Sequence, residues 1–173
     1  VTLDDAQGAD GNYPKVAPVI SHLDDGGPAW ADAGVICPME VYETYGDISL
    51  LRRHYPSMKR FLDFCEKRSK PDLLPPDKYH IYGDWLSINA DTPNDVITTA
   101  YFAGSAGLVS RAAEALGNSG DAKKYRDLRD RVAAAFRNAF VLPDGKVKGD
   151  TQCGYVLALG FDLLTPGQAK AAT

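Results

Sequence analysis

Two short segments of the sequence each place a tryptophan beside an aspartate. Trp30 and Asp32 lie in Gly26-Gly-Pro-Ala-Trp-Ala-Asp, at the start of a predicted helix, and Asp84 and Trp85 lie in Tyr82-Gly-Asp-Trp, inside a long predicted loop. An indole can stack on the apolar face of a sugar ring, and a carboxylate can accept hydrogen bonds from neighbouring hydroxyl groups. The two pairs therefore predict the side chains of a carbohydrate-binding cleft.

A purely structural role is the alternative for the same residues. Indoles commonly anchor hydrophobic cores, and Asp32 would favour the N-terminus of a helix. Four further carboxylates, which are better explained as capping or solvated groups, are Glu40, Glu43, Asp91 and Asp95. Glycoside hydrolysis needs two carboxyl groups at a fixed separation, and a sequence does not measure that separation.

Composition excludes several other classes of protein. The chain has 173 residues, with 19 Lys and Arg against 23 Asp and Glu and a net charge of −4, and it lacks the basic clusters that nucleic-acid binders carry. No stretch approaches the roughly 20 apolar residues of a membrane span. The three cysteines and three histidines are scattered, so the sequence predicts neither a metal site nor a cofactor.

The hydrophobic periodicity predicts an all-α protein. The expected helices span residues 29–45, 48–67, 94–116, 121–140 and 155–164, the last of them opened by Thr151 and buried on most sides. Predicted N-caps are Asp47, Thr92 before Pro93, and Thr165 before Pro166. Residues 142–146 predict a turn, with Val147 on the return of a small hairpin.

The charge content of these helices alternates. Residues 94–116 and 151–164 carry few charges, whereas residues 48–67 and 121–140 carry many. Inner and outer layers of a ring of antiparallel helix pairs would differ in this way. A helical solenoid is the alternative, but no fixed period recurs along the chain.

Both ends of the sequence look like parts of interrupted helices. Residues 1–7 resemble the last turns of a helix, and Thr165-Pro166 opens another with only seven residues following. We therefore expect residues 1–173 to be part of a longer domain that is truncated at both ends, with the rest of the parent polypeptide as its partner.

A set of motifs, in order, resembles the central catalytic domain of bacterial α-L-rhamnosidases, family 78 of the glycoside hydrolases. The motifs are Gly27-Pro-Ala-Trp-Ala-Asp-Ala33, Pro38-Met-Glu-Val-Tyr-Glu-Thr-Tyr-Gly-Asp47, Tyr55-Pro-Ser-Met58, Gly83-Asp-Trp-Leu86, Thr98-Thr-Ala-Tyr101, Ala113-x-x-Leu-Gly117, Asp150-Thr-Gln152 and Tyr155-Val-Leu-Ala-Leu159. Each motif alone is modest, but their order and spacing cover nearly the whole chain.

The resemblance implies about half of an (α/α)6 barrel and an inverting hydrolysis of terminal α-L-rhamnosides without a metal. Trp30 and Trp85 match tryptophans that line the family's rhamnose pocket, and Asp32 and Asp84 are their neighbours. The family's general acid lies in a D-E-R-x-G-W-x-G-D motif and its general base is a later glutamate. Neither is present in this sequence, so we expect these 173 residues alone to be inactive.

Two rival interpretations stay open at this point. One is another (α/α)6 glycosidase that acts on a different sugar. The other is a non-catalytic helical scaffold or sugar-binding module. Nothing in the sequence decides between the cytoplasm, the periplasm and the exterior of the cell.

Overall fold

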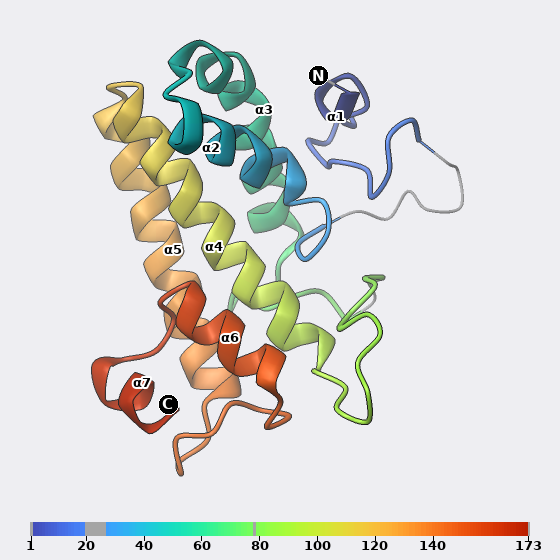
Figure 1. Cartoon of the computed structure of the whole chain (residues 1–173), viewed down its shortest axis with the longest axis vertical. Coiled ribbons are helices and arrows are strands. Elements are labelled where there is room, and N and C mark those ends of the chain that lie inside the picture. Colours follow the sequence, from blue (N-terminus) through green and yellow to red (C-terminus); the bar gives the residue numbers. More distant parts are fainter. Residues whose placement is uncertain (1, 20–26, 78, 173) are drawn as a thin grey trace.

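The structure, a computed structural model, describes residues 2–19, 27–77 and 79–172, and this part of the chain is helical (Figure 1). The helices are α1 (Thr2–Asp5), α2 (Ala33–Tyr45), α3 (Ile48–Arg68), α4 (Asn94–Ala115), α5 (Ser119–Phe140), α6 (Gln152–Gly160) and α7 (Pro166–Ala171). Within these ranges the β-structure is one antiparallel bridge between Val141 and Val147, which confirms the small hairpin. Gly26, Val1 and Thr173 lie outside the described residues.

α4 and α5 form a long antiparallel pair, and α2, α3 and α6 pack against α4 (Figure 1). The turn between them has Gly117 in the left-handed region, with φ 77°, and Asn118 N–H donates to Ala113 O at 2.8 Å. Most of α4 is buried, and its small side chains allow close packing. α5 buries one apolar face and exposes a charged one, so the predicted division into apolar and charged helices is confirmed for this pair.

Several helix ends follow the local signals in the sequence. Asp47 caps α3 by accepting hydrogen bonds from the backbone of Ser49 and Leu50. Thr151 caps α6, and Thr165 forms a capping box with Gln168 at the start of α7. These caps act within four residues of chain, which is why the sequence predicts them.

Other boundaries differ from the expectation. α2 begins at Ala33 instead of residue 29, because Ala29, with φ 91°, belongs to a preceding turn. α5 begins two residues early, at Ser119. α6 spans Gln152–Gly160 instead of 155–164, since Asp162 has φ 54° and Leu163 N–H turns back to Ala158 O at 2.9 Å.

Two further expectations are wrong. Thr92 does not cap α4: the N-cap position is Pro93, without a side-chain hydrogen bond, and the Thr92 hydroxyl is used in the tertiary structure. α6 is not buried on most sides, because only Gly154 and Ala158 are fully covered and Val156 is 61% exposed. Among the described helices, none combines the length and the apolar character that a membrane crossing demands.

The segment before α2 is held by a buried tyrosine. Tyr13 is fully buried and its ring lies 5.2 Å from that of Phe61 on α3. A Cβ at Gly34 of α2 would lie 2.3 Å from the Tyr13 ring, so only glycine allows this approach. The contact fixes the chain two residues before Lys15, which reaches the site described next.

Candidate functional site

The structure brings the two predicted tryptophans together. Trp30 lies before α2 and Trp85 lies in the loop before α4, yet their ring centroids are 5.7 Å apart. Tyr82 packs against both, with its ring centroid 4.5 Å from that of Trp30 and 5.1 Å from that of Trp85, so the three centroids form a triangle. These three rings, Trp30, Tyr82 and Trp85, form what we call the aromatic cluster.

The aromatic cluster is open to solvent. Trp30 is 41% exposed and Trp85 is 57% exposed, although large aromatic side chains are usually well covered. The hypothesis that both indoles are core anchors is therefore not supported by their burial. The three packed rings are tilted by 31–58° to one another, and the exposed indoles offer apolar faces of the kind on which a sugar ring can stack.

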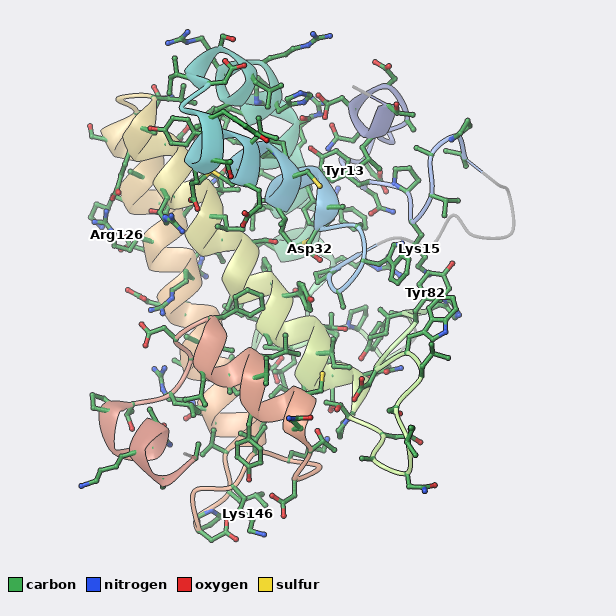
Figure 2. The ribbon with its side chains drawn as sticks, viewed as in Figure 1. Tyr13, Lys15, Asp32, Tyr82, Arg126 and Lys146 are labelled. Carbon is green, nitrogen blue, oxygen red and sulfur yellow. The ribbon has the colours of Figure 1, made fainter. Side chains whose placement is uncertain are left out.

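Lys15 and His80 lie behind the cluster. The Trp30 indole N–H donates to Lys15 O at 2.7 Å, which fixes the ring at its polar edge. Lys15 Nζ lies 2.6 Å from His80 Nδ1 and 5.5 Å from the Tyr82 ring centroid. Figure 2 shows Lys15 and Tyr82 next to each other, on the side of the molecule away from α5.

Asp32 is close in sequence to Trp30 but is turned into the protein. It is 1% exposed, and Figure 2 shows it at the start of α2, beside α4. Its Oδ2 accepts the backbone N–H of Ala29 at 2.7 Å, and its Oδ1 accepts the hydroxyl of Ser105 on α4. Burial raises the pKa of Asp32 to about 7, although the hydrogen bonds from Ser105 and Ala29 lower it in part.

Asp84 occupies a half-buried position next to Trp85. Its Oδ2 accepts the hydroxyl of Thr92 at 2.8 Å, and Thr92 Oγ1 lies 2.7 Å from Thr151 Oγ1. Thr151 is the N-cap of α6. The loop that carries Tyr82 and Trp85 is thus linked by side-chain hydrogen bonds to the residues that precede α4 and α6.

Three of the four weaker carboxylate candidates have structural partners. Glu43 forms an ion pair with Arg111, and Asp95 pairs with Lys148. Asp91 accepts the hydroxyl of Ser87, while Glu40 is exposed on α2. Across the described ranges no group of three or more His, Cys, Asp or Glu side chains could hold a metal ion.

Sequence reasoning missed three members of the site. Tyr82 stands two residues before Asp84, and this position in the same predicted loop is the signal that could have identified it as a site residue. Lys15 and His80 carry no such signal, because their contacts join segments 65 residues apart. Such contacts depend on how the loops pack and are not visible as local motifs.

Comparison with known proteins identifies the family and supports the fold. The family model described as the bacterial alpha-L-rhamnosidase 6 hairpin glycosidase domain matches residues 1–173. An alpha-L-rhamnosidase of Streptomyces avermitilis is 47% identical over 99% of this chain, and one of Alteromonas sp. (strain LOR) is 33% identical over 99%. The chain spans only 16% and 20% of the lengths of these two relatives.

A solved structure shows the same arrangement of helices. The crystal structure of the Streptomyces avermitilis alpha-L-rhamnosidase complexed with L-rhamnose superposes with a TM-score of 0.92 and 46% identity, covering 99% of this chain and 16% of that one. The match to the family model and the agreement in fold support the same family assignment. The chain belongs to the bacterial α-L-rhamnosidase six-hairpin glycosidase family, and its helices form part of an (α/α)6 barrel.

Proposed function

We propose that this chain contributes the aromatic part of the sugar-binding site of an α-L-rhamnosidase, a glycoside hydrolase that removes terminal α-L-rhamnose. The observation that carries the proposal is the convergence of Trp30, Tyr82 and Trp85 on one solvent-exposed surface. The similarity to an enzyme whose structure is complexed with L-rhamnose supports it.

The chemistry of rhamnose suits such a surface. L-Rhamnose is a 6-deoxyhexose, so a methyl group replaces the polar hydroxymethyl group of an ordinary hexose. The methyl group and the C–H faces of the ring can pack on the indoles of Trp30 and Trp85, while the hydroxyl groups point elsewhere. We propose that Asp84 meets those hydroxyls through Oδ1, since Thr92 already engages its Oδ2.

The proposed contribution of the chain is to bind and orient the sugar. Inversion uses one carboxylic acid to protonate the leaving oxygen and one carboxylate to activate water, with the two groups roughly 6.5–9.5 Å apart. The family's acid motif does not occur in this sequence, so we assign both groups to residues outside it. A ring held on the aromatic cluster would present its anomeric carbon to them in a fixed orientation.

Kinetics of the complete enzyme that carries this segment test the proposal. With p-nitrophenyl α-L-rhamnoside, Trp30→Ala or Trp85→Ala should lower kcat/KM by about tenfold to a hundredfold, mainly through KM, because stacking area is lost. Tyr45→Ala is the matched control, since Tyr45 is an aromatic residue 79% exposed at the end of α2, outside the cluster. Unchanged kcat/KM in both tryptophan variants would rule out the sugar-stacking role.

The activity of the chain itself is a second arm of this experiment. These 173 residues alone should release no measurable p-nitrophenol from the same substrate. Measurable release of p-nitrophenol by these residues alone would contradict the assignment of the acid and base to residues outside this sequence.

A further inference from the structure

We propose that Asp32 is a positioning residue for Trp30, locking the turn that carries the indole onto α4. The inference deepens the proposed function, on which it rests for the role of Trp30 in sugar binding. It gives Asp32 a different task from the direct sugar contact that its place in the sequence suggests. Three observations carry it: the strained turn, the anchor on α4, and the missing cap.

The turn before α2 has an unusual backbone. Gly27 has φ 136°, and Ala29, the residue directly before Trp30, has φ 91°. Residues with a Cβ rarely adopt such angles, and they persist only where surrounding contacts hold them. Asp32 supplies one such contact, because its Oδ2 accepts the Ala29 N–H at 2.7 Å.

The other carboxylate oxygen connects this turn to α4. Oδ1 of Asp32 accepts the Ser105 hydroxyl, 73 residues further along the chain. Ser105 is 2% exposed and lies on α4, whose small side chains pack closely against its neighbours. One carboxylate therefore connects the turn that presents Trp30 with a rigid inner helix.

Helix capping does not explain Asp32. The residue occupies the N-cap position of α2, but its side chain makes no capping hydrogen bond to the first turn of that helix. No ion pair to its carboxylate is found in the part of the chain that the structure describes. A buried carboxylate without a cation is unfavourable for folding. An uncharged side chain at this position would therefore give a more stable fold than aspartate does.

The position of Trp30 is sensitive to this turn. The indole meets Tyr82 at a centroid distance of 4.5 Å and donates to Lys15 O at 2.7 Å. Both contacts come from other segments, so a rotation of the turn would separate the indole from them. The consequence would be a looser aromatic cluster and weaker sugar binding, without loss of the helices.

A single-tryptophan form of the chain tests the inference. Trp30 and Trp85 are its two tryptophans, so Trp85→Phe leaves Trp30 as the only indole. In this background, acrylamide quenching of the emission measures how well Trp30 is held. Ser105→Ala and Asp32→Ala should each raise the quenching constant about twofold or more, because an anchoring hydrogen bond is lost.

Two variants serve as controls. Asp32→Asn keeps an acceptor for Ala29 N–H and a partner for Ser105, so it should leave quenching close to the value of the Trp85→Phe background. Ser110→Ala is matched to Ser105→Ala: Ser110 is also a buried serine of α4, but its hydroxyl donates to Ala122 O at 2.8 Å. It should leave Trp30 unaffected. Far-UV circular dichroism checks the helices of every variant.

Kinetics of the complete enzyme, with Trp85 intact, separate this inference from the proposed function. Ser105→Ala should raise KM for p-nitrophenyl α-L-rhamnoside about threefold to tenfold, whereas Asp32→Asn, with Ser105 intact, should leave KM close to that of the parent enzyme. Equal quenching and equal KM for Ser105→Ala and Ser110→Ala would overturn the positioning role. If quenching rises but neither Ser105→Ala nor Trp30→Ala changes KM, the positioning role stands and the sugar-binding role of Trp30 fails.

Discussion

At the residue scale, the aromatic cluster depends on polar atoms that lie behind it. The Trp30 indole is held by Lys15 O, and the loop of Trp85 is held through Asp84 by the hydroxyl of Thr92. Hydrogen bonds of this kind fix the orientation of rings that remain exposed on their other face. Each tryptophan therefore has a neighbouring aspartate that connects it to the barrel helices.

Asp32 should make the stability of the chain depend on pH. Burial raises its pKa to about 7, whereas a carboxyl group of an unfolded chain titrates near 3.9. Between these values the folded state binds more protons than the unfolded state, so Asp32 lowers the free energy of unfolding as pH rises from about 4 to about 7. Above pH 7 its contribution is constant.

Asp32→Asn removes this pH dependence. Relative to the variant, the parent chain should lose roughly 2–3 kcal/mol of unfolding free energy between pH 5 and pH 8. Cys65 of α3 and Tyr101 of α4 face Asp32, but burial raises the pKa of each, so both stay neutral in this range. Urea unfolding of both proteins measures the difference. The same difference at both pH values would show that Asp32 does not titrate there.

At the scale of secondary-structure elements, close helix approach depends on small residues. Gly104 of α4 faces the Phe161 ring, which follows α6, and a Cβ on Gly104 would lie 2.7 Å from two atoms of that ring. Phe161 also packs edge-on against Tyr101, with ring centroids 5.3 Å apart. The ring therefore has little freedom to move away from α4.

Gly104→Ala should destabilise the chain by about 1–3 kcal/mol, because the added methyl group forces α4 and α6 apart. Gly120→Ala is the matched control: it is also a helical glycine, but nothing lies within 4 Å of its added Cβ. That substitution should be neutral or stabilise by up to about 1 kcal/mol, since alanine favours the helix. Thermal unfolding compares the two, and equal effects would contradict close α4–α6 packing.

The elements also show what a sequence can and cannot predict here. Caps such as Asp47 and Thr165 act on their own helices, so their residue types were sufficient. Thr92 has the same signature, but its hydroxyl bonds to Asp84 and lies against Thr151, 59 residues away. A hydrogen bond to a residue of another segment therefore takes the place of a cap on α4, and only the packed structure reveals this difference.

At the scale of the whole molecule, the chain is a set of packed helices in which the segments before α2 and before α4 meet at one site. Trp30 and Trp85 were predicted as sugar-stacking residues from their types and from the family resemblance, and the structure places them side by side. The burial of the Asp32 side chain could not be predicted, because it depends on the hydrogen bond with Ser105 of α4. The family and the all-α fold followed from motif order and helix periodicity, which are properties of the whole sequence.

The most direct test of the central claim is a titration of the 173-residue chain with L-rhamnose, followed by tryptophan emission. Both tryptophans lie in the aromatic cluster, so the signal reports the proposed site alone. We expect a saturable change with a dissociation constant of roughly 1–10 mM. L-Mannose, which differs only by a hydroxyl group on C6, should bind several-fold more weakly. No saturable change, or equal binding of L-rhamnose and L-mannose, would contradict the account.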